Sequence, residues 1–480
     1  MNKFKLFVEN FIVYGFGGVI SKIIPLIMVP IVAKLLPSED YYGISDMSNT
    51  IISFASAIAV MGMYDAMYRL FFDKEDEKYK KEICSTTLLF TIITSIAVFG
   101  LMIILKNVLA IIFLKDINLN YVIYISAFAT LVGATNSIIS APTRMQNKRG
   151  VFLVLNTIGP IISYAIAIPM ILKGYYIIAL PLAFALSNFS IESVFAILNR
   201  KWFSLKNFKK DYLKPLLIIA VPLIPNFLIY WIFNSSDRLM ITNLLSLGDD
   251  AVYAVGSKLG LASQLVYTAF AGGWQFFAFS VMKEKNQVET NSKIFEYLGI
   301  ISFASFSLIC VISFPLYYVL FKGTSYVNGY IIAPYLYLAP LLQMLFQVEA
   351  NQFLVIKKTW PNMLILSFGA VFNVFLNFLL IPRIGIEGAA IATLTGYILS
   401  DIICAFILCR MKLMSFSVKF IISVVLCAVF FGVWRFMFSD NIIGAILSSI
   451  LLILIYLVLY YNETKLLIGQ MKSLMNKKKE

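Results

Sequence analysis

The sequence predicts an all-α, polytopic integral membrane protein. Of its 480 residues, 60% are hydrophobic and only 13% are charged, and the mean hydropathy is +0.86. Soluble domains are nearer half apolar and a quarter charged. Long apolar runs recur from residue 6 to residue 462 instead of being confined to one segment. Lipid offers the backbone no hydrogen-bond partners, so we expect these runs to cross the bilayer as helices.

Apolar segments of roughly 20 residues are long enough to cross the hydrocarbon core, and their number predicts about fourteen transmembrane helices. We place these helices at residues 6–36, 41–71, 83–114, 118–141, 150–172, 175–199, 213–243, 250–281, 294–321, 329–356, 361–381, 386–409, 416–438 and 441–462. The sequence has no histidine, no CxxC pair among its five cysteines and no nucleotide-binding glycine loop. Histidine metal sites, a disulfide framework and an intrinsic ATP motor are therefore excluded, and we expect no cofactor.

The basic residues predict that both termini lie in the cytoplasm. With that orientation, 28 of the 39 Lys and Arg residues fall at inner ends and loops, and only 7 fall at outer ends. This distribution follows the positive-inside rule. The net charge of +14 is then explained by topology and by contact with anionic membrane lipids, so we expect no nucleic-acid partner.

The chain looks duplicated at an offset of about 210 residues, which pairs Arg200 with Arg410. An even number of spans separates the copies, so the repeats are parallel, and paired lobes of this kind enclose a central cleft in transporters. The sequence therefore predicts two pseudo-symmetric six-helix lobes followed by two further helices and a basic cytoplasmic tail. The predicted boundaries are 1–205, 206–412 and 413–480.

Ionisable residues inside the predicted spans are the candidate site. A charge at the bilayer centre costs about 2.5–3.5 kcal/mol on insertion scales, so it should face the bundle interior or a wet cavity. The predicted cleft cations, suited to a phosphate group, are Lys22, Arg69, Arg238 and Lys258. The predicted ion-pair or coupling acids are Asp65, Asp237 and Glu349, and Asp65 stands four residues before Arg69, where the two can pair. Cations outnumber the nearby acids, which favours an anionic substrate.

Polar stripes run along two of the predicted spans. We predict that they line the cleft, and their members are Asn226, Tyr230, Asn234, Gln343, Gln347 and Asn351. Polar stripes also join helices through hydrogen bonds, so packing and pathway both stay open for them. Mid-span prolines concentrate in the first and seventh spans, which favours helices that bend and gate the cleft.

Three sequence blocks resemble the polysaccharide flippases of the multidrug/oligosaccharidyl-lipid/polysaccharide exporter superfamily. The first block runs from Tyr14-Gly15 to Gly43. The second consists of Ser236-Asp237-Arg238, Tyr253-Ala254-Val255 and Lys258. The third runs from Asn373 to Thr393 and contains the turn Ile381-Pro382-Arg383-Ile384-Gly385. The resemblance covers essentially the whole chain. It implies a non-enzymatic flippase of the bacterial inner (plasma) membrane. Its cargo would be a polyprenyl-diphosphate-linked oligosaccharide repeat unit, moved from the inner to the outer leaflet for O-antigen, capsule or exopolysaccharide assembly.

Three alternatives stand beside this reading. A peptidoglycan lipid-precursor flippase of the same superfamily also carries a lipid diphosphate. A drug or cation antiporter is disfavoured by fourteen spans and a cationic cleft. A membrane glycosyltransferase or polymerase is disfavoured because the outer loops are short and hold no acid cluster. The implied partners are membrane lipids, a polysaccharide polymerase and glycosyltransferases, and coupling to protons or to sodium stays open.

Overall fold

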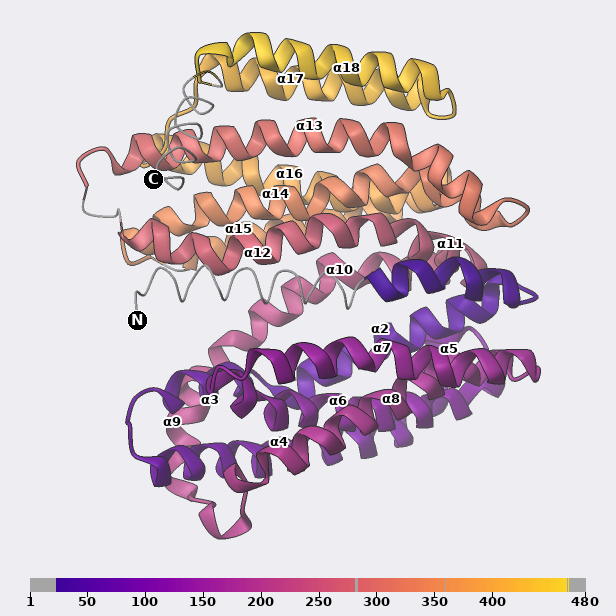
Figure 1. Ribbon diagram of the computed structural model, residues 1–480, viewed down its shortest axis with the longest axis vertical. Helices are drawn as coiled ribbons and strands as arrows, with labels where there is room; N and C mark the ends of the chain where they lie inside the picture. Colours follow the sequence, from indigo (N-terminus) through magenta and orange to yellow (C-terminus); the bar gives the residue numbers. More distant parts are fainter. Residues whose placement is uncertain (1–22, 281–283, 359, 464, 466–480) are drawn as a thin grey trace, which may run out of the picture.

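The described part of the chain is built from helices arranged in two groups. The computed structural model describes residues 23–280, 284–358, 360–463 and 465, and every regular element within them is a helix. Figure 1 shows one group of helices stacked on the other, with α10 (Ile224–Leu244) between them. The predicted class, an all-α polytopic membrane protein, is confirmed.

The first group, here called the N-terminal bundle, contains the helices between residues 39 and 220. Its helices are α2 (Glu39–Val60), α3 (Met63–Phe71), α4 (Glu77–Ile104), α5 (Lys106–Leu114), α6 (Asn120–Met145), α7 (Arg149–Leu172) and α8 (Tyr176–Asn199). The short α9 (Leu213–Ala220) packs against α3 and α4 and therefore belongs with this group.

The second group, here called the C-terminal bundle, contains α10 and the helices that follow it. These are α10 (Ile224–Leu244), α11 (Leu247–Gly256), α12 (Gly260–Ser280), α13 (Gln287–Phe321), α14 (Gly329–Val355), α15 (Trp360–Ile384), α16 (Ile386–Arg410), α17 (Val418–Val433) and α18 (Ile442–Leu459). α17 and α18 pack on the outside of α13, as Figure 1 shows at the top of the view. α10 packs on α15 of its own bundle and on α2 of the other.

Eleven helices of the described residues are long and apolar enough to cross a membrane, and α2 with α3 would make a twelfth as one bent span. The two other predicted spans do not meet that test. The span at 6–36 is represented by the shorter apolar helix Ile23–Leu35, and its earlier residues lie outside the described part. The span at 250–281 is divided into α11 and α12. The number fourteen therefore stays a prediction, as do the lobe boundaries.

Side-chain caps explain where several helices begin. The carboxylate of Asp76 accepts hydrogen bonds from the backbone N–H groups of Lys78 and Tyr79 at the start of α4. The hydroxyl oxygen of Ser246 accepts a hydrogen bond of 3.0 Å from the backbone N–H of Asp249 at the start of α11. These caps satisfy the N–H groups that a helix leaves free in its first turn.

Two spans are broken at residues that cannot continue a helix. The second predicted span bends by 47° between α2 and α3, where Met61 and Gly62 both have positive φ. A Cβ on Gly62 would lie 2.6 Å from the carbonyl oxygen of Ala220, so only glycine fits there. The seventh span is interrupted by a 3₁₀ turn at Pro222, and Pro225 opens α10. The 3₁₀ turn lies where the chain passes from α9 of the N-terminal bundle to α10.

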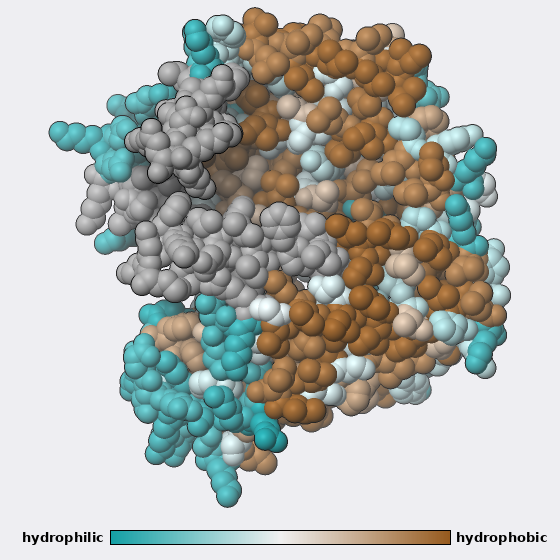
Figure 2. Space-filling model, viewed as in Figure 1, coloured by the Kyte–Doolittle hydropathy of each residue, from teal (hydrophilic) through white to brown (hydrophobic). Residues whose placement is uncertain are grey.

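The surface matches a protein that lies in a bilayer. Figure 2 shows apolar residues across the middle of both bundles and hydrophilic residues gathered toward the two edges of the view. An apolar belt between two polar edges is the pattern that hydrocarbon and headgroups select.

Candidate functional site

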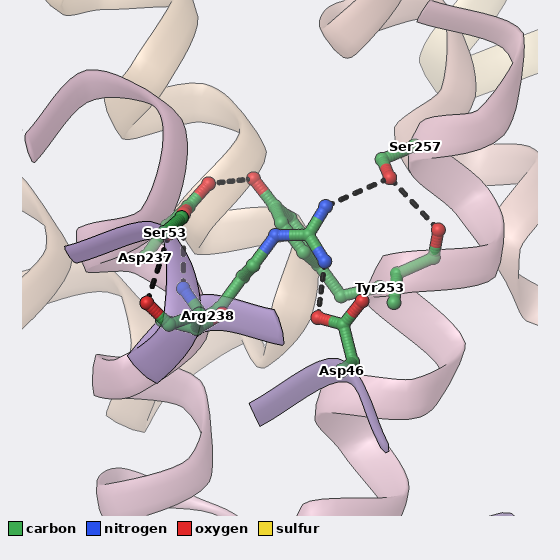
Figure 3. A network of polar contacts seen from close by, with 8 residues as sticks. Asp46, Ser53, Asp237, Arg238, Tyr253 and Ser257 are labelled. Carbon is green, nitrogen blue, oxygen red and sulfur yellow. Dashed lines mark hydrogen bonds and ion pairs between the residues drawn. The ribbon is translucent and has the colours of Figure 1, made fainter. Parts of the chain in front are cut away.

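An ion pair joins the two bundles. Arg238 of α10 forms a salt bridge through Nη1 with the carboxylate of Asp46 on α2, and the two side chains are 19% and 7% exposed. The Nη2 atom of Arg238 donates to Ser257 Oγ at 3.2 Å, as Figure 3 shows. Arg238 therefore contacts both bundles at once. A guanidinium suits this position because its planar group of N–H donors can donate to two acceptors at the same time.

Asp237, the neighbour of Arg238, is held inside the C-terminal bundle. Its carboxylate accepts from the hydroxyl of Tyr253 on α11, and from Thr393 Oγ1 on α16 at 3.5 Å. The chain of polar contacts continues into α15: Asn373 Nδ2 donates to Thr393 Oγ1 at 3.1 Å, and Asn377 Nδ2 donates to Asn373 Oδ1 at 3.3 Å. A buried carboxylate is thus satisfied by hydroxyl groups from two other helices.

Two further charges complete what we call the charge network: Asp46, Asp237, Arg238, Asp250 and Lys258. Asp250 is fully buried, and neither of its carboxylate oxygens has a hydrogen-bond partner among the described residues. Lys258 interacts electrostatically with Asp46, Arg238 and Asp250. Lys258 and Pro30 of the apolar helix Ile23–Leu35 line the same small cavity.

The balance of charge differs from the expected excess of cations. Within the described residues the network holds three acids, Asp46, Asp237 and Asp250, and two cations, Arg238 and Lys258. The charge of Arg238 is already matched by its ion pair. The fourth predicted cation, Lys22, lies outside the described residues.

A cavity of about 200 Å³ lies beside the network. Its polar lining includes four residues that the sequence predicted, namely Asn234, Asp237, Arg238 and Gln343. Aromatic and small residues form much of the remaining wall, among them Phe233, Tyr253, Gly260, Pro340 and Tyr397. The structure therefore brings part of the predicted polar lining together, from α10 and α14, around one space.

Other predicted lining residues lie outside this wall. Tyr230 is next to Gln343 but does not line the cavity. The predicted lining residues Asn226, Gln347 and Asn351 are also absent from its lining, and so is the predicted coupling acid Glu349. Glu349 is fully buried on α14, where its acidic neighbour is Asp401 of α16.

The predicted pair of Asp65 with Arg69 is corrected by the structure. Arg69 forms its salt bridge with Asp73, which is also four residues away, and both side chains are on the surface, 66% and 36% exposed. Asp65 lies in the first turn of α3, where the free N–H groups of the helix favour a carboxylate. Neither Arg69 nor Asp65 belongs to the charge network or to the cavity wall.

Sequence reasoning missed Asp46 and Asp250. Asp46 lies inside the predicted span 41–71, and Asp250 begins the span 250–281, so both were intramembrane acids by position. The rule that such residues mark functional sites would have found Asp46. Its partner was out of reach of the sequence, because Asp46 and Arg238 are 192 residues apart.

Together the fold and the network define a polytopic α-helical membrane protein with a polar cavity next to an ion pair between two helix bundles. Residues 7–282 match the model of the family described as "Polysaccharide biosynthesis protein". The chain belongs to this family. No curated protein matches the sequence.

Solved structures share the fold across most of the chain. A lipid II flippase MurJ in an inward closed conformation superposes with a TM-score of 0.71 at 16% identity, covering 96% of this chain and 99% of that one. An inward-facing multidrug resistance MATE family transporter has a TM-score of 0.57 at 16% identity, covering 82% and 98%. A transporter of the same superfamily from Pyrococcus furiosus has a TM-score of 0.57 at 15% identity, covering 85% and 95%. These structures show a shared fold, and the match of residues 7–282 to the polysaccharide biosynthesis family agrees with the predicted family resemblance.

Proposed function

We propose that this protein is a flippase that moves a polyprenyl-diphosphate-linked oligosaccharide repeat unit from the inner to the outer leaflet by alternating access. The observation that carries the proposal is the charge network beside a polar cavity, at a contact between two bundles of a chain from the polysaccharide biosynthesis family. Buried charges at such a contact mark substrate pathways in membrane proteins. We place the protein in the bacterial plasma membrane with both termini cytoplasmic.

Contacts at one end of the bundles support alternating access. Ser325 donates to Glu39 through its hydroxyl, and Asn243 Nδ2 donates to the carbonyl oxygen of Ile112 at 2.9 Å. A Cβ on Gly43 of α2 would lie 2.1 Å from the carbonyl oxygen of Leu247, so the two backbones touch there. These contacts join the bundles at the end that the positive-inside pattern assigns to the outside. The passage would open to the outer leaflet when they separate.

The diphosphate of the substrate would be held by the cations of the network. Lys258 and Lys22 are the proposed first ligands, because Arg238 is already paired with Asp46. A diphosphate that reached Arg238 would compete with Asp46 for the guanidinium, since both are oxyanions that accept from its fork. Losing the pair with Asp46 would weaken the contact between α2 and α10. Substrate binding would thereby favour separation of the bundles.

We infer transport rather than catalysis, with the flipped unit passed to a polymerase after glycosyltransferases have built it. The polyprenyl tail would stay in lipid while the polar headgroup crosses between the bundles. Sugar transfer by the purified protein would overturn this inference.

A second candidate function has one observation in its favour. The similarity in fold to the lipid II flippase MurJ covers 96% of this chain, so a peptidoglycan lipid precursor is the alternative cargo. Deletion of the gene separates the two. Loss of surface polysaccharide, with lipid-linked oligosaccharide accumulating on the cytoplasmic side and growth unchanged, is expected for the repeat unit. Lysis would show that the precursor is the cargo.

Substitution of the proposed phosphate ligands tests the site. We expect Lys22→Ala and Lys258→Ala each to abolish complementation of the deletion strain while the protein remains at wild-type level in the membrane. Lys322→Ala is the matched control, because this lysine is exposed at the end of α13, belongs neither to the charge network nor to the cavity wall, and should be silent. Full complementation by both Lys22→Ala and Lys258→Ala would show that the diphosphate is not held there.

A further inference from the structure

Two carboxylic acids meet inside the C-terminal bundle, outside the charge network. Glu349 of α14 is fully buried, and neither of its carboxylate oxygens accepts from an oxygen or nitrogen donor among the described residues. Asp401 of α16 is its acidic neighbour, and Asp401 Oδ1 is equally without a partner in that part of the chain. α14 and α16 pack directly on each other.

No cation balances this pair. The titratable groups that act on Glu349 are Asp401 and the thiols of Cys404 and Cys409, all on α16. Tyr397, which is also on α16, interacts electrostatically with Asp401. Among the described residues, none of the groups that act on the pair carries positive charge.

The neighbouring helix α13 contributes amides to this region instead of charges. Gln352 stands three residues after Glu349, so the two share a face of α14. Its Oε1 accepts from Gln287 of α13 at 2.8 Å, while its Nε2 is fully buried with no partner among the described residues. The nearby acid of α13, Glu296, is occupied by the backbone N–H and hydroxyl of Ser417. An amide donor without a partner among the described residues thus lies one turn from Glu349, whose carboxyl is approached by the thiol of Cys404.

The pair can be neutral only by holding protons. Moving one carboxylate from water into a protein interior costs several kcal/mol, and a second charge beside it adds repulsion. Two acids that share such a site therefore do not both ionise. A proton needs only one carboxyl oxygen, whereas a sodium ion would need several oxygen ligands, so we take a proton as the ligand of this pair.

The pair is connected to the cavity through the helices that carry it. Asp401 stands four residues after Tyr397, which lines the cavity and stacks on Phe233 of α10 with ring centroids 4.3 Å apart. α14 reaches the same cavity through Gln343. A shift of α10 during alternating access would therefore move the side chain that packs on Tyr397, one helical turn before Asp401. Water reaching the acids would then allow them to exchange protons.

We propose that Glu349 and Asp401 form a proton-binding site that couples the transport cycle to proton movement across the membrane. The coupling rests on the proposed function, because it requires a transport cycle to drive. Proton binding itself does not depend on the identity of the cargo.

Infrared difference spectra of the full-length protein in lipid, taken between acidic and alkaline buffer, test proton binding without any substrate. The wild type should show a protonated-carboxyl band that is lost in Glu349→Gln and in Asp401→Asn. Both variants resemble the protonated acids in shape, so we expect them to fold and reach the membrane. Glu296→Gln is the matched control, a buried acid with satisfied partners, and should keep the band. A band unchanged in both variants would overturn the proton site.

Transport in proteoliposomes tests the coupling, with a polyprenyl-diphosphate oligosaccharide as the cargo. A pH gradient should accelerate wild-type transport, and Glu349→Gln should lose that acceleration while Glu296→Gln retains it. Acceleration by a sodium gradient alone would overturn the coupling. If the band behaves as expected but the wild type moves no lipid-linked sugar, the proposed function fails and the proton site stands.

Discussion

Asp46→Asn should lower the stability of the folded protein, because it removes the carboxylate of the ion pair between the bundles and leaves the charged Arg238 in a largely buried position. The side chains of Asp46 and Arg238 are only 7% and 19% exposed, so little water is at hand to replace the lost partner. Breaking a buried ion pair by removing one member typically costs about 3–5 kcal/mol. Arg238 keeps a hydrogen bond to the hydroxyl of Ser257 and the attraction of Asp237 and Asp250, which together offset only part of this cost.

The matched control is Asp73→Asn, which breaks the surface pair of Asp73 with Arg69. These two side chains are 36% and 66% exposed, and exposed pairs contribute about 0–1 kcal/mol. Thermal unfolding of the purified variants in detergent measures the difference. We expect Asp46→Asn to lower the melting temperature clearly and Asp73→Asn to leave it near that of the wild type. Equal melting temperatures for both variants would refute the argument that the inter-bundle pair is a buried, stabilising contact.

Two further predictions concern packing between helices. Gly43→Ala should disturb the contact of α2 with Leu247, because the new Cβ would lie 2.1 Å from the carbonyl oxygen of Leu247, and overpacking of this kind costs about 1–3 kcal/mol. We therefore expect this variant to complement the deletion strain poorly. Gly100→Ala is the control and should complement fully, because no atom lies within 4 Å of the added Cβ. Arg435→Gln should lower thermal stability by about 1–3 kcal/mol, because Glu387 loses a charged donor at 2.6 Å that joins η8 (Trp434–Phe438), the continuation of α17, to α16. An unchanged melting temperature would show that this contact does not hold the last helices in place.

The fold class could be predicted from the sequence because it depends on local quantities. The lengths of apolar runs fix where helices cross lipid, and basic residues mark the ends of those runs. The bend between α2 and α3 was not predicted, since a run of apolar residues reads the same whether or not it is kinked. Gly62 was the only local sign of it, and what requires glycine there is the backbone of Ala220, which is distant in sequence.

The site was predictable only one helix at a time. Spacing along a helix finds partners three or four residues apart, so it suggested Asp65 for Arg69, and Asp73 at the same spacing is the actual partner. The partner of Arg238 comes from another bundle, 192 residues earlier, and no periodicity reports such a contact. The sequence singled out Arg238 as an intramembrane charge, but it could not show that Asp46 pairs with it.

A reversible lock across the ends of the bundles tests the central claim, that these ends must separate during transport. A Cβ built on Gly248 lies 3.7 Å from the Cβ of Glu39, and disulfides need about 3.5–4.5 Å. Glu39→Cys with Gly248→Cys can be made together with Cys409→Ser, because the other cysteines are buried. We predict that oxidation links the pair and stops transport of lipid-linked oligosaccharide in proteoliposomes, and that reduction restores it, while each single-cysteine variant is indifferent to oxidant. Transport at the full rate by the cross-linked protein would contradict alternating access through this contact.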